Sequence, residues 1–237
     1  MPKTIKDISI LIPCYNELET IQKSIFQAEK LKNFKKEIII IDNGSVDGCQ
    51  KVISKYKNKK NFKIVLRNKN LGYGSSVKEA LKIASKKYLY IHFSDCEYDI
   101  NTVYKMFNLA ENHKLDAVFG SRLKNHSLIK KIILLREKPA YLGTLFITKL
   151  YNLLYGTNFT DVIGSKFYKV SSLKKIKIEL NHFRFDFKLK SLLMKNKFKV
   201  KEVFTKYVPR SNSAKKNVKF YHLFPAVYEI LKNKFID

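Results

Sequence analysis

The stretch ISILIPCYNE, residues 8–17, begins with five apolar residues and is interrupted at Pro13. A short apolar run of this kind is typical of a strand that is buried on both faces of a parallel sheet. Apolar side chains then recur at helical spacing, at Ile21, Ile25 and Ala28. The stretch therefore predicts a buried strand that leads directly into a helix.

The same order of strand and helix recurs along the chain. Further apolar runs bounded by turn residues predict strands at residues 37–41, 62–66, 88–93 and 117–121. Strands that alternate with helices predict an α/β fold whose mostly parallel sheet has helices on both faces. No internal repeat or flexible linker interrupts the pattern, so we expect a single domain over residues 1–237.

The chain carries 47 Lys and Arg against 20 Asp and Glu, a formal net charge of +27. Such a charge favours a nucleic acid, an anionic lipid surface or phosphate groups as partners. The lysines, however, are spread along the whole chain, which is equally typical of a solvated surface. Because arginine is scarce, each of the five arginines is more informative about function than any lysine. We expect two of them, Arg67 and Arg184, on the surface.

Cysteine use and hydropathy limit the class of protein. Cys14, Cys49 and Cys96 are odd in number and form no CxxC pair, which argues against a disulfide framework or a thiolate zinc site. No uncharged apolar run approaches the roughly 20 residues that span a bilayer, and Pro13 interrupts the short N-terminal run. We therefore expect a cytoplasmic protein without a signal peptide.

Three carboxylates, Asp95, Glu97 and Asp99, follow the predicted strand at 88–93 directly. Side chains two residues apart at a strand end point the same way, so Asp95 and Glu97 could face one point in space. Two bare carboxylates about 4 Å apart repel by roughly 4 kcal/mol, and a divalent cation such as Mg²⁺ removes that repulsion. The alternative is a solvated acidic turn at the start of the next helix, which explains Asp99 well.

Polar loops follow the other predicted strands as well. Because the carboxyl ends of parallel strands meet at one edge of a sheet, these loops are expected to form one crevice. Asp42 could accept a hydrogen bond from a nucleobase or ribose, and Gly44 and Gly72 let the backbone approach a ligand. Ordinary turns are the alternative. Neither GxGxxG nor GxxxxGK[ST] is present, so no dinucleotide or P-loop ATP site is predicted.

Six stretches of the chain are IPCYNE (12–17), EIIIIDNGSVDG (37–48), NLGYG (70–74), SDCEYD (94–99), GSR (120–122) and KVKEVFTKYVPRSNSAKK (199–216). Together they resemble glycosyltransferase family 2, which has the GT-A fold, and particularly its dolichol-phosphate mannosyltransferase and polyprenyl-phosphate glycosyltransferase branch. Any one piece is common, but their order and spacing cover nearly the whole chain. The family's usual DxD is DxE here, at Asp95 and Glu97.

The resemblance implies a nucleotide-sugar-binding half, residues 1–122, and an acceptor-binding half with a C-terminal helix, residues 123–237. It implies that Asp95 and Glu97, with Asp99 as a third ligand, hold Mg²⁺ or Mn²⁺ on the donor diphosphate. Catalytic roles fall on Asp95, Arg210 and Asp186. The implied nucleotide-sugar site consists of Pro13, Tyr15, Glu17, Asp42, Gly44, Gly72, Asp95, Glu97, Arg122, Arg136, Arg210 and Lys215.

The implied reaction is an inverting sugar transfer to a polyprenyl-phosphate or glycan acceptor in cell-envelope polysaccharide or glycolipid synthesis. A lipid phosphate needs no strong base, whereas a sugar hydroxyl needs a carboxylate base, for which Asp186 is the first candidate and Asp161 the second. A nucleotidyltransferase on a similar sheet is one alternative, but it would normally have a Gly-rich phosphate loop where IPCYNE stands. A basic nucleic-acid-binding protein is the other, and it leaves Asp95 without a role.

Two segments in the second half of the chain are candidates for membrane contact. Residues 140–155 form an apolar stripe with lysines just upstream, so this helix is expected either to rest on an anionic inner leaflet or to cover the sheet. Residues 220–235 are similarly ambiguous, and Pro225 is expected to break their first half. Peripheral contact with the inner face of the cell membrane is thus an expectation, and nucleic acid is not expected as a partner.

Overall fold

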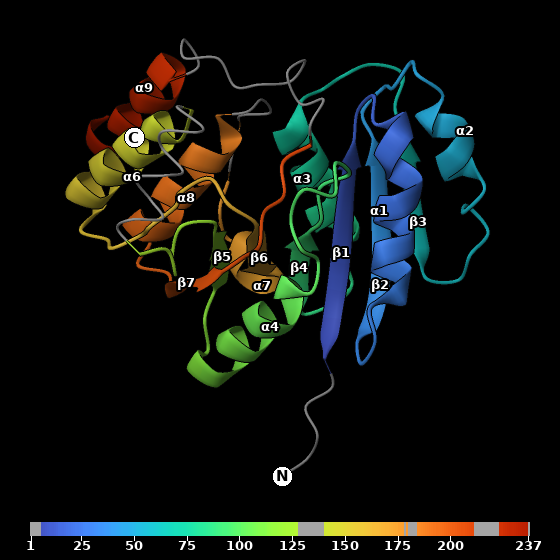
Figure 1. Cartoon of the computed structure of the whole chain (residues 1–237), viewed down its shortest axis with the longest axis horizontal. Helices are drawn as coiled ribbons and strands as arrows, with labels where there is room; N and C mark the ends of the chain where they lie inside the picture. The colour runs from blue at the N-terminus through green and yellow to red at the C-terminus, as the bar shows by residue number, and fades with distance from the viewer. Residues whose placement is uncertain (1–5, 128–139, 178, 180–183, 211–222, 237) are drawn as a thin grey trace.

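A computed structural model describes residues 6–127, 140–177, 179, 184–210 and 223–236 of the chain (Figure 1). Within these residues a seven-stranded sheet has the order β3-β2-β1-β4-β6-β5-β7. Its strands are β1 Asp7–Cys14, β2 Lys35–Asp42, β3 Phe62–Leu66, β4 Tyr88–Ile91, β5 Ala117–Ser121, β6 Lys166–Lys169 and β7 Val200–Phe204. The helices are α1 Leu18–Lys30, α2 Cys49–Ser54, α3 Tyr73–Ile83, α4 Thr102–His113, α6 Ala140–Tyr155, α7 Val170–Leu173, α8 Phe185–Lys195 and α9 Leu223–Phe235.

The sheet is mostly parallel. Strand β1 pairs in parallel with β2 and β4, β2 with β3, and β5 with β7, whereas β6 runs antiparallel to both β4 and β5. This arrangement confirms the predicted α/β fold and all five predicted strands. Strands β6 and β7 were not predicted, because both are short and carry lysines that break the apolar pattern.

Both faces of the sheet are covered, which explains the continuous apolar runs. Ile10 and Ile12 of β1 pack on the side of α1, α2 and α4, whereas Leu11 packs on the opposite side, against α3 and α8. Figure 1 shows α1 in front of the sheet and α3 behind it. A strand buried on both sides has few polar positions along its length, so its polar residues fall at its two ends.

A third apolar cluster joins α6, α8 and α9 beside the β5–β6–β7 part of the sheet. Ile147 and Tyr151 of α6 pack in it with Ala226 and Ile230 of α9. Pro225 does not break α9, contrary to expectation, because it lies in the first turn of the helix. Backbone N–H groups in the first turn have no helical acceptor, so the N–H that proline lacks costs no hydrogen bond there. No helix within the described ranges is long and apolar enough to cross a membrane.

Candidate active site

The carboxyl ends of β1, β2 and β4 meet at one edge of the sheet. Cys14 of β1 lies opposite Asp42 of β2, and Leu11 lies opposite Ile91 of β4. The loops that leave these ends are tied together, since the Ser94 hydroxyl donates to the Pro13 carbonyl at 2.9 Å. The expected convergence of these three loops is therefore present.

Asp42 anchors the loop that follows β2 and is fully buried. Its Oδ1 atom accepts hydrogen bonds from the backbone N–H groups of Gly44 and Ser45, at 3.1 and 2.9 Å, and from Gln50 Nε2 at 2.8 Å. Its Oδ2 atom is buried and has no hydrogen-bond partner among the residues that the structure describes. A buried carboxylate oxygen without a donor is costly, so Asp42 is suited to accept a hydrogen bond from a ligand.

The packing of this loop requires a glycine at position 44. Its φ of +81° lies in the left-handed region, and an added Cβ would come within 2.6–2.8 Å of the Lys69 backbone. Gly72, at φ +85°, precedes α3 in the neighbouring loop. Gly44 thus allows the loops after β2 and β3 to approach closely.

Arg67 lies in this same part of the site and not on the open surface where it was expected. Its Nη1 atom donates to Asn43 Oδ1 at 2.9 Å and its Nη2 atom to the Ser75 carbonyl at 3.3 Å. Its backbone N–H donates to the carbonyl of Asp42 at 3.1 Å. Its position directly after the strand at 62–66 was the signal that could have identified it. Arg184 instead lies 3.5 Å from the buried carboxylate of Glu229.

Three carboxylates gather around one guanidinium beside these loops. Arg210 donates from Nη1 to Glu17 Oε2 at 2.8 Å, and its Nε atom lies 3.4 Å from Glu97 Oε1. The Tyr207 hydroxyl donates to Glu97 Oε2 at 2.6 Å, and the backbone N–H of Glu97 donates to Asp95 Oδ1 at 3.1 Å. We call Glu17, Asp95, Glu97 and Arg210 the acidic cluster.

The acidic cluster is electrostatically crowded. Burial, together with the charges of Glu97 and Glu17, raises the pKa of Asp95 to about 6, although Arg210 acts in the opposite direction. One guanidinium therefore does not compensate three carboxylates at this edge. Carboxylate oxygens are the ligands that Mg²⁺ and related hard cations take, so the donor set of Asp95 and Glu97 fits such an ion.

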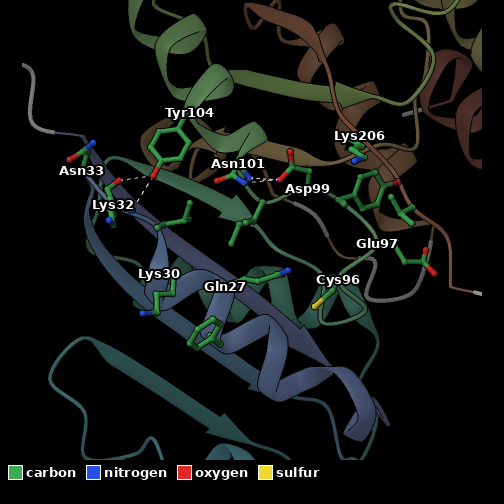
Figure 2. A pocket seen from close by; sticks show the side chains of 15 residues that line it. Gln27, Lys30, Lys32, Asn33, Cys96, Glu97, Asp99, Asn101, Tyr104 and Lys206 are labelled. Carbon is green, nitrogen blue, oxygen red and sulfur yellow. Dashed lines mark hydrogen bonds between the residues drawn. The ribbon is translucent and has the colours of Figure 1, made fainter.

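Asp99 does not join the acidic cluster, although it was expected as a third metal ligand. Its Oδ1 atom accepts hydrogen bonds from the backbone N–H and the side-chain amide of Asn101, at 3.0 and 3.1 Å, at the start of α4. Figure 2 shows the carboxylates of Asp99 and Glu97 pointing in different directions, with Asp99 turned toward Asn101, although both residues line a groove of about 760 Å³ between α1 and α4. No group of three His, Cys, Asp or Glu side chains in the described part of the chain forms a metal site.

Arg122 contacts the acidic cluster only indirectly. Its guanidinium pairs bidentately with Asp161, at 2.6 and 3.0 Å, and lies 5.3 Å from the ring centroid of Tyr207. Although burial acts against ionisation, Arg122 lowers the pKa of Asp161. Because Asp161 is fully buried and both of its oxygens bind Arg122, it is a poor candidate for a catalytic base.

The remaining predicted residues fall in three places. Tyr15 is 42% exposed in the loop after β1, two residues before Glu17 of the acidic cluster. Asp186 lies in the first turn of α8, with its Oδ2 atom 2.9 Å from the buried ammonium of Lys166. Arg136 and Lys215 lie outside the described residues, so their expected phosphate contacts stay predictions.

The model of the family "Glycosyl transferase family 2" matches residues 9–177 of the chain. The chain belongs to glycosyl transferase family 2. This match confirms the predicted family, while the dolichol-phosphate branch stays a prediction. The poly-beta-1,6-N-acetyl-D-glucosamine synthase of Staphylococcus epidermidis is 34% identical over 141 residues, which are 59% of this chain and 34% of that synthase. The synthase of Staphylococcus aureus (strain COL) is 35% identical over the same length, so the match spans about a third of either relative.

Solved structures agree with this family at the level of the fold. S. aureus TarS 1–349 in complex with UDP-GlcNAc has a TM-score of 0.61 and 16% identity, and the match covers 98% of this chain and 68% of that chain. Glucosyl-3-phosphoglycerate synthase from Mycobacterium tuberculosis, in complex with Mn²⁺, UDP-Glc and phosphoglyceric acid, has a TM-score of 0.65 and 13% identity. That match covers 98% of this chain and 81% of the synthase.

The packing at Gly44 predicts a position-specific loss of stability. Gly44→Ala is expected to lower the free energy of unfolding by about 1–3 kcal/mol more than Gly156→Ala, as measured by urea denaturation. Both positions have positive φ, but an added Cβ at Gly156 meets nothing within 4 Å, so the difference isolates the contact with the Lys69 backbone. Equal losses in the two variants would contradict the close approach of the two loops.

The crowding in the acidic cluster predicts that removing one charge stabilises the metal-free protein. Asp95→Asn keeps the acceptor for the Glu97 N–H and removes a carboxylate whose pKa is raised to about 6. In the presence of a chelator at pH 8, its free energy of unfolding is expected to exceed that of the wild type by about 1–3 kcal/mol. Asp99→Asn is the matched control and should show no such gain. A less stable Asp95→Asn protein would show that the carboxylate is not crowded.

Proposed function

We propose that the protein transfers a sugar, with inversion, from a nucleotide-sugar to a polyprenyl-phosphate or glycan acceptor in cell-envelope polysaccharide or glycolipid synthesis. The single observation that carries the proposal is the acidic cluster, which lies at the same sheet edge as the buried Asp42. A crowded carboxylate pair suits a cation-bound diphosphate, and an unpaired buried oxygen suits a nucleobase. In this proposal residues 1–122 bind the donor and residues 123–237 bind the acceptor.

We place the donor across the loops after β1, β2 and β4. Asp42 would accept a hydrogen bond from the base, with Pro13, Tyr15 and the backbone near Gly44 beside it. The similarity to poly-N-acetylglucosamine synthases, and to a fold neighbour that binds UDP-GlcNAc, favours a UDP-linked sugar. Gly72 and Arg67 would lie at the far side of the base, where Arg67 holds Asn43 in place.

Asp95 and Glu97 would hold a divalent ion, Mg²⁺ or Mn²⁺, and a fold neighbour in complex with Mn²⁺ and UDP-Glc supports this. Such an ion stabilises the negative charge that develops on the departing diphosphate. Arg210 would assist, because its planar fork binds phosphate oxygens in pairs and the carboxylates of Glu17 and Glu97 hold it at the site.

The acceptor decides whether a base is needed. A polyprenyl phosphate is already a competent nucleophile, and it would place the enzyme at the cytoplasmic face of the cell membrane. A glycan hydroxyl must lose a proton, and Asp186 is the proposed base for that case. Lys166 binds its Oδ2 atom at 2.9 Å and thus fixes the orientation of the carboxylate.

Release of nucleoside diphosphate tests the proposal. The purified chain would be incubated with UDP-GlcNAc, UDP-glucose or GDP-mannose, with and without Mn²⁺, and with undecaprenyl phosphate or an N-acetylglucosamine oligosaccharide as acceptor. We expect turnover of one donor that requires both the metal and an acceptor. Asp95→Asn should lower the rate by about 100-fold or more, because it weakens charge stabilisation in the transition state.

Asp99→Asn is the matched control for this assay. Asp99 binds Asn101, the residue before α4, and is not part of the acidic cluster, so this variant should stay within a few-fold of the wild-type rate. Equal losses in Asp95→Asn and Asp99→Asn would contradict the proposed metal site. Failure of every donor, together with tight and salt-sensitive binding of unrelated oligonucleotides, would favour a nucleic-acid-binding protein instead.

A further inference from the structure

Helices α6 and α9 each expose a stripe of large apolar side chains. On α6, Leu142, Phe146 and Leu153 are 57%, 53% and 81% exposed, and their spacing of four and seven residues places them on one helical face. On α9 the exposed residues have the same helical spacing and are Phe224, Tyr228, Leu231 and Phe235. We call these seven side chains the α6–α9 face. Large apolar side chains that recur along one exposed side of a helix make that side a candidate interaction site.

The two helices are neighbours whose opposite sides are buried together. Ile147 and Ile230 belong to the same apolar cluster, and the Tyr155 hydroxyl at the end of α6 donates to the Ile230 carbonyl at 3.1 Å. Each exposed stripe therefore lies on the side of its helix that faces away from this shared core. Figure 1 shows α6 and α9 next to each other at the end of the molecule toward which β1 runs, on the side away from α1 and α2.

The charges on these helices select an anionic partner. Helix α6 contains no Asp or Glu, and the acidic residue of α9, Glu229, is 2% exposed and bonded to Asn233 and Arg184. The exposed charges on the two helices are cationic, at Lys149 and Lys234. An apolar surface with lysines and without an exposed carboxylate complements the headgroup region of an anionic bilayer.

We propose that the α6–α9 face docks on an anionic lipid surface. Its apolar side chains enter the boundary between headgroups and acyl chains, and Lys149 lies against lipid phosphates. This inference rests on the proposed function in one respect, because the docked face would hold the donor-binding edge of the sheet near a lipid-linked acceptor. The docking itself depends only on the two helices.

Flotation with lipid vesicles tests the docking. The purified chain would be mixed with phosphatidylcholine vesicles that contain about 30% phosphatidylglycerol, and with vesicles of phosphatidylcholine alone. We expect binding to the anionic vesicles that weakens in high salt, and weak binding to the neutral ones. The double variant Phe146→Ser/Leu153→Ser should bind about tenfold or more weakly. Lys149→Gln should bind about fivefold more weakly.

Phe26→Ser is the matched control, because Phe26 is 55% exposed on α1, outside the α6–α9 face. It should bind the vesicles as the wild type does. All substituted side chains are exposed, so thermal melting should be unchanged and a loss of binding cannot be attributed to unfolding. Equal binding by the double variant and the control would overturn the proposal. A dimer in light scattering that the double variant dissociates, without vesicle binding, would also overturn it in favour of a second copy.

The docking and the proposed function can fail separately. Coupled binding of Mn²⁺ and UDP should be the same in the double variant and the wild type, since the α6–α9 face lies outside residues 1–122, the proposed donor-binding half. Vesicle binding without turnover of any donor would contradict the proposed function alone. Turnover without vesicle binding would contradict the docking alone.

Discussion

The site depends on the electrostatic crowding of three carboxylates around Arg210. Strands β1 and β4 are adjacent and parallel, so the loops that follow them leave the sheet at one edge and bring Glu17 close to Asp95 and Glu97. Burial makes this proximity costly, and one guanidinium offsets only part of the cost, which the raised pKa of Asp95 reflects. A divalent ion and a diphosphate would complete the charge balance that the protein leaves open.

The central part of the fold could be predicted because its physical cause is visible in the sequence. Residues 8–12 and 37–41 are buried on both faces, so they read as continuous apolar runs. Strand β6 could not be found in this way, because its first residue, Lys166, is 2% exposed and paired with Asp186, a residue of another element. A pattern read along the chain treats such a lysine as a surface residue, since its partner is close only in the folded protein.

The same distinction applies to the site residues. Asp42 and Asp95 could be predicted because each follows a buried strand, whose end fixes their position. The direction of the Asp99 carboxylate could not be predicted, since it accepts hydrogen bonds from Asn101 just before α4 and not from a group in the acidic cluster. Arg67 directly follows the strand at 62–66, so its place at the site could have been predicted in the same way as that of Asp42, although its contact with Asn43 could not. The contact between Arg210 and Glu17 joins residues 193 positions apart and becomes apparent only in the structure.

The most direct test of the central claim is a measurement of coupled binding of Mn²⁺ and UDP by thermal melting. If the acidic cluster holds a cation on a diphosphate, the two ligands together should raise the melting temperature more than the sum of their separate effects. This extra shift should be absent in Asp95→Asn and present in Asp99→Asn. Independent effects of Mn²⁺ and UDP, or an unchanged extra shift in Asp95→Asn, would contradict the account.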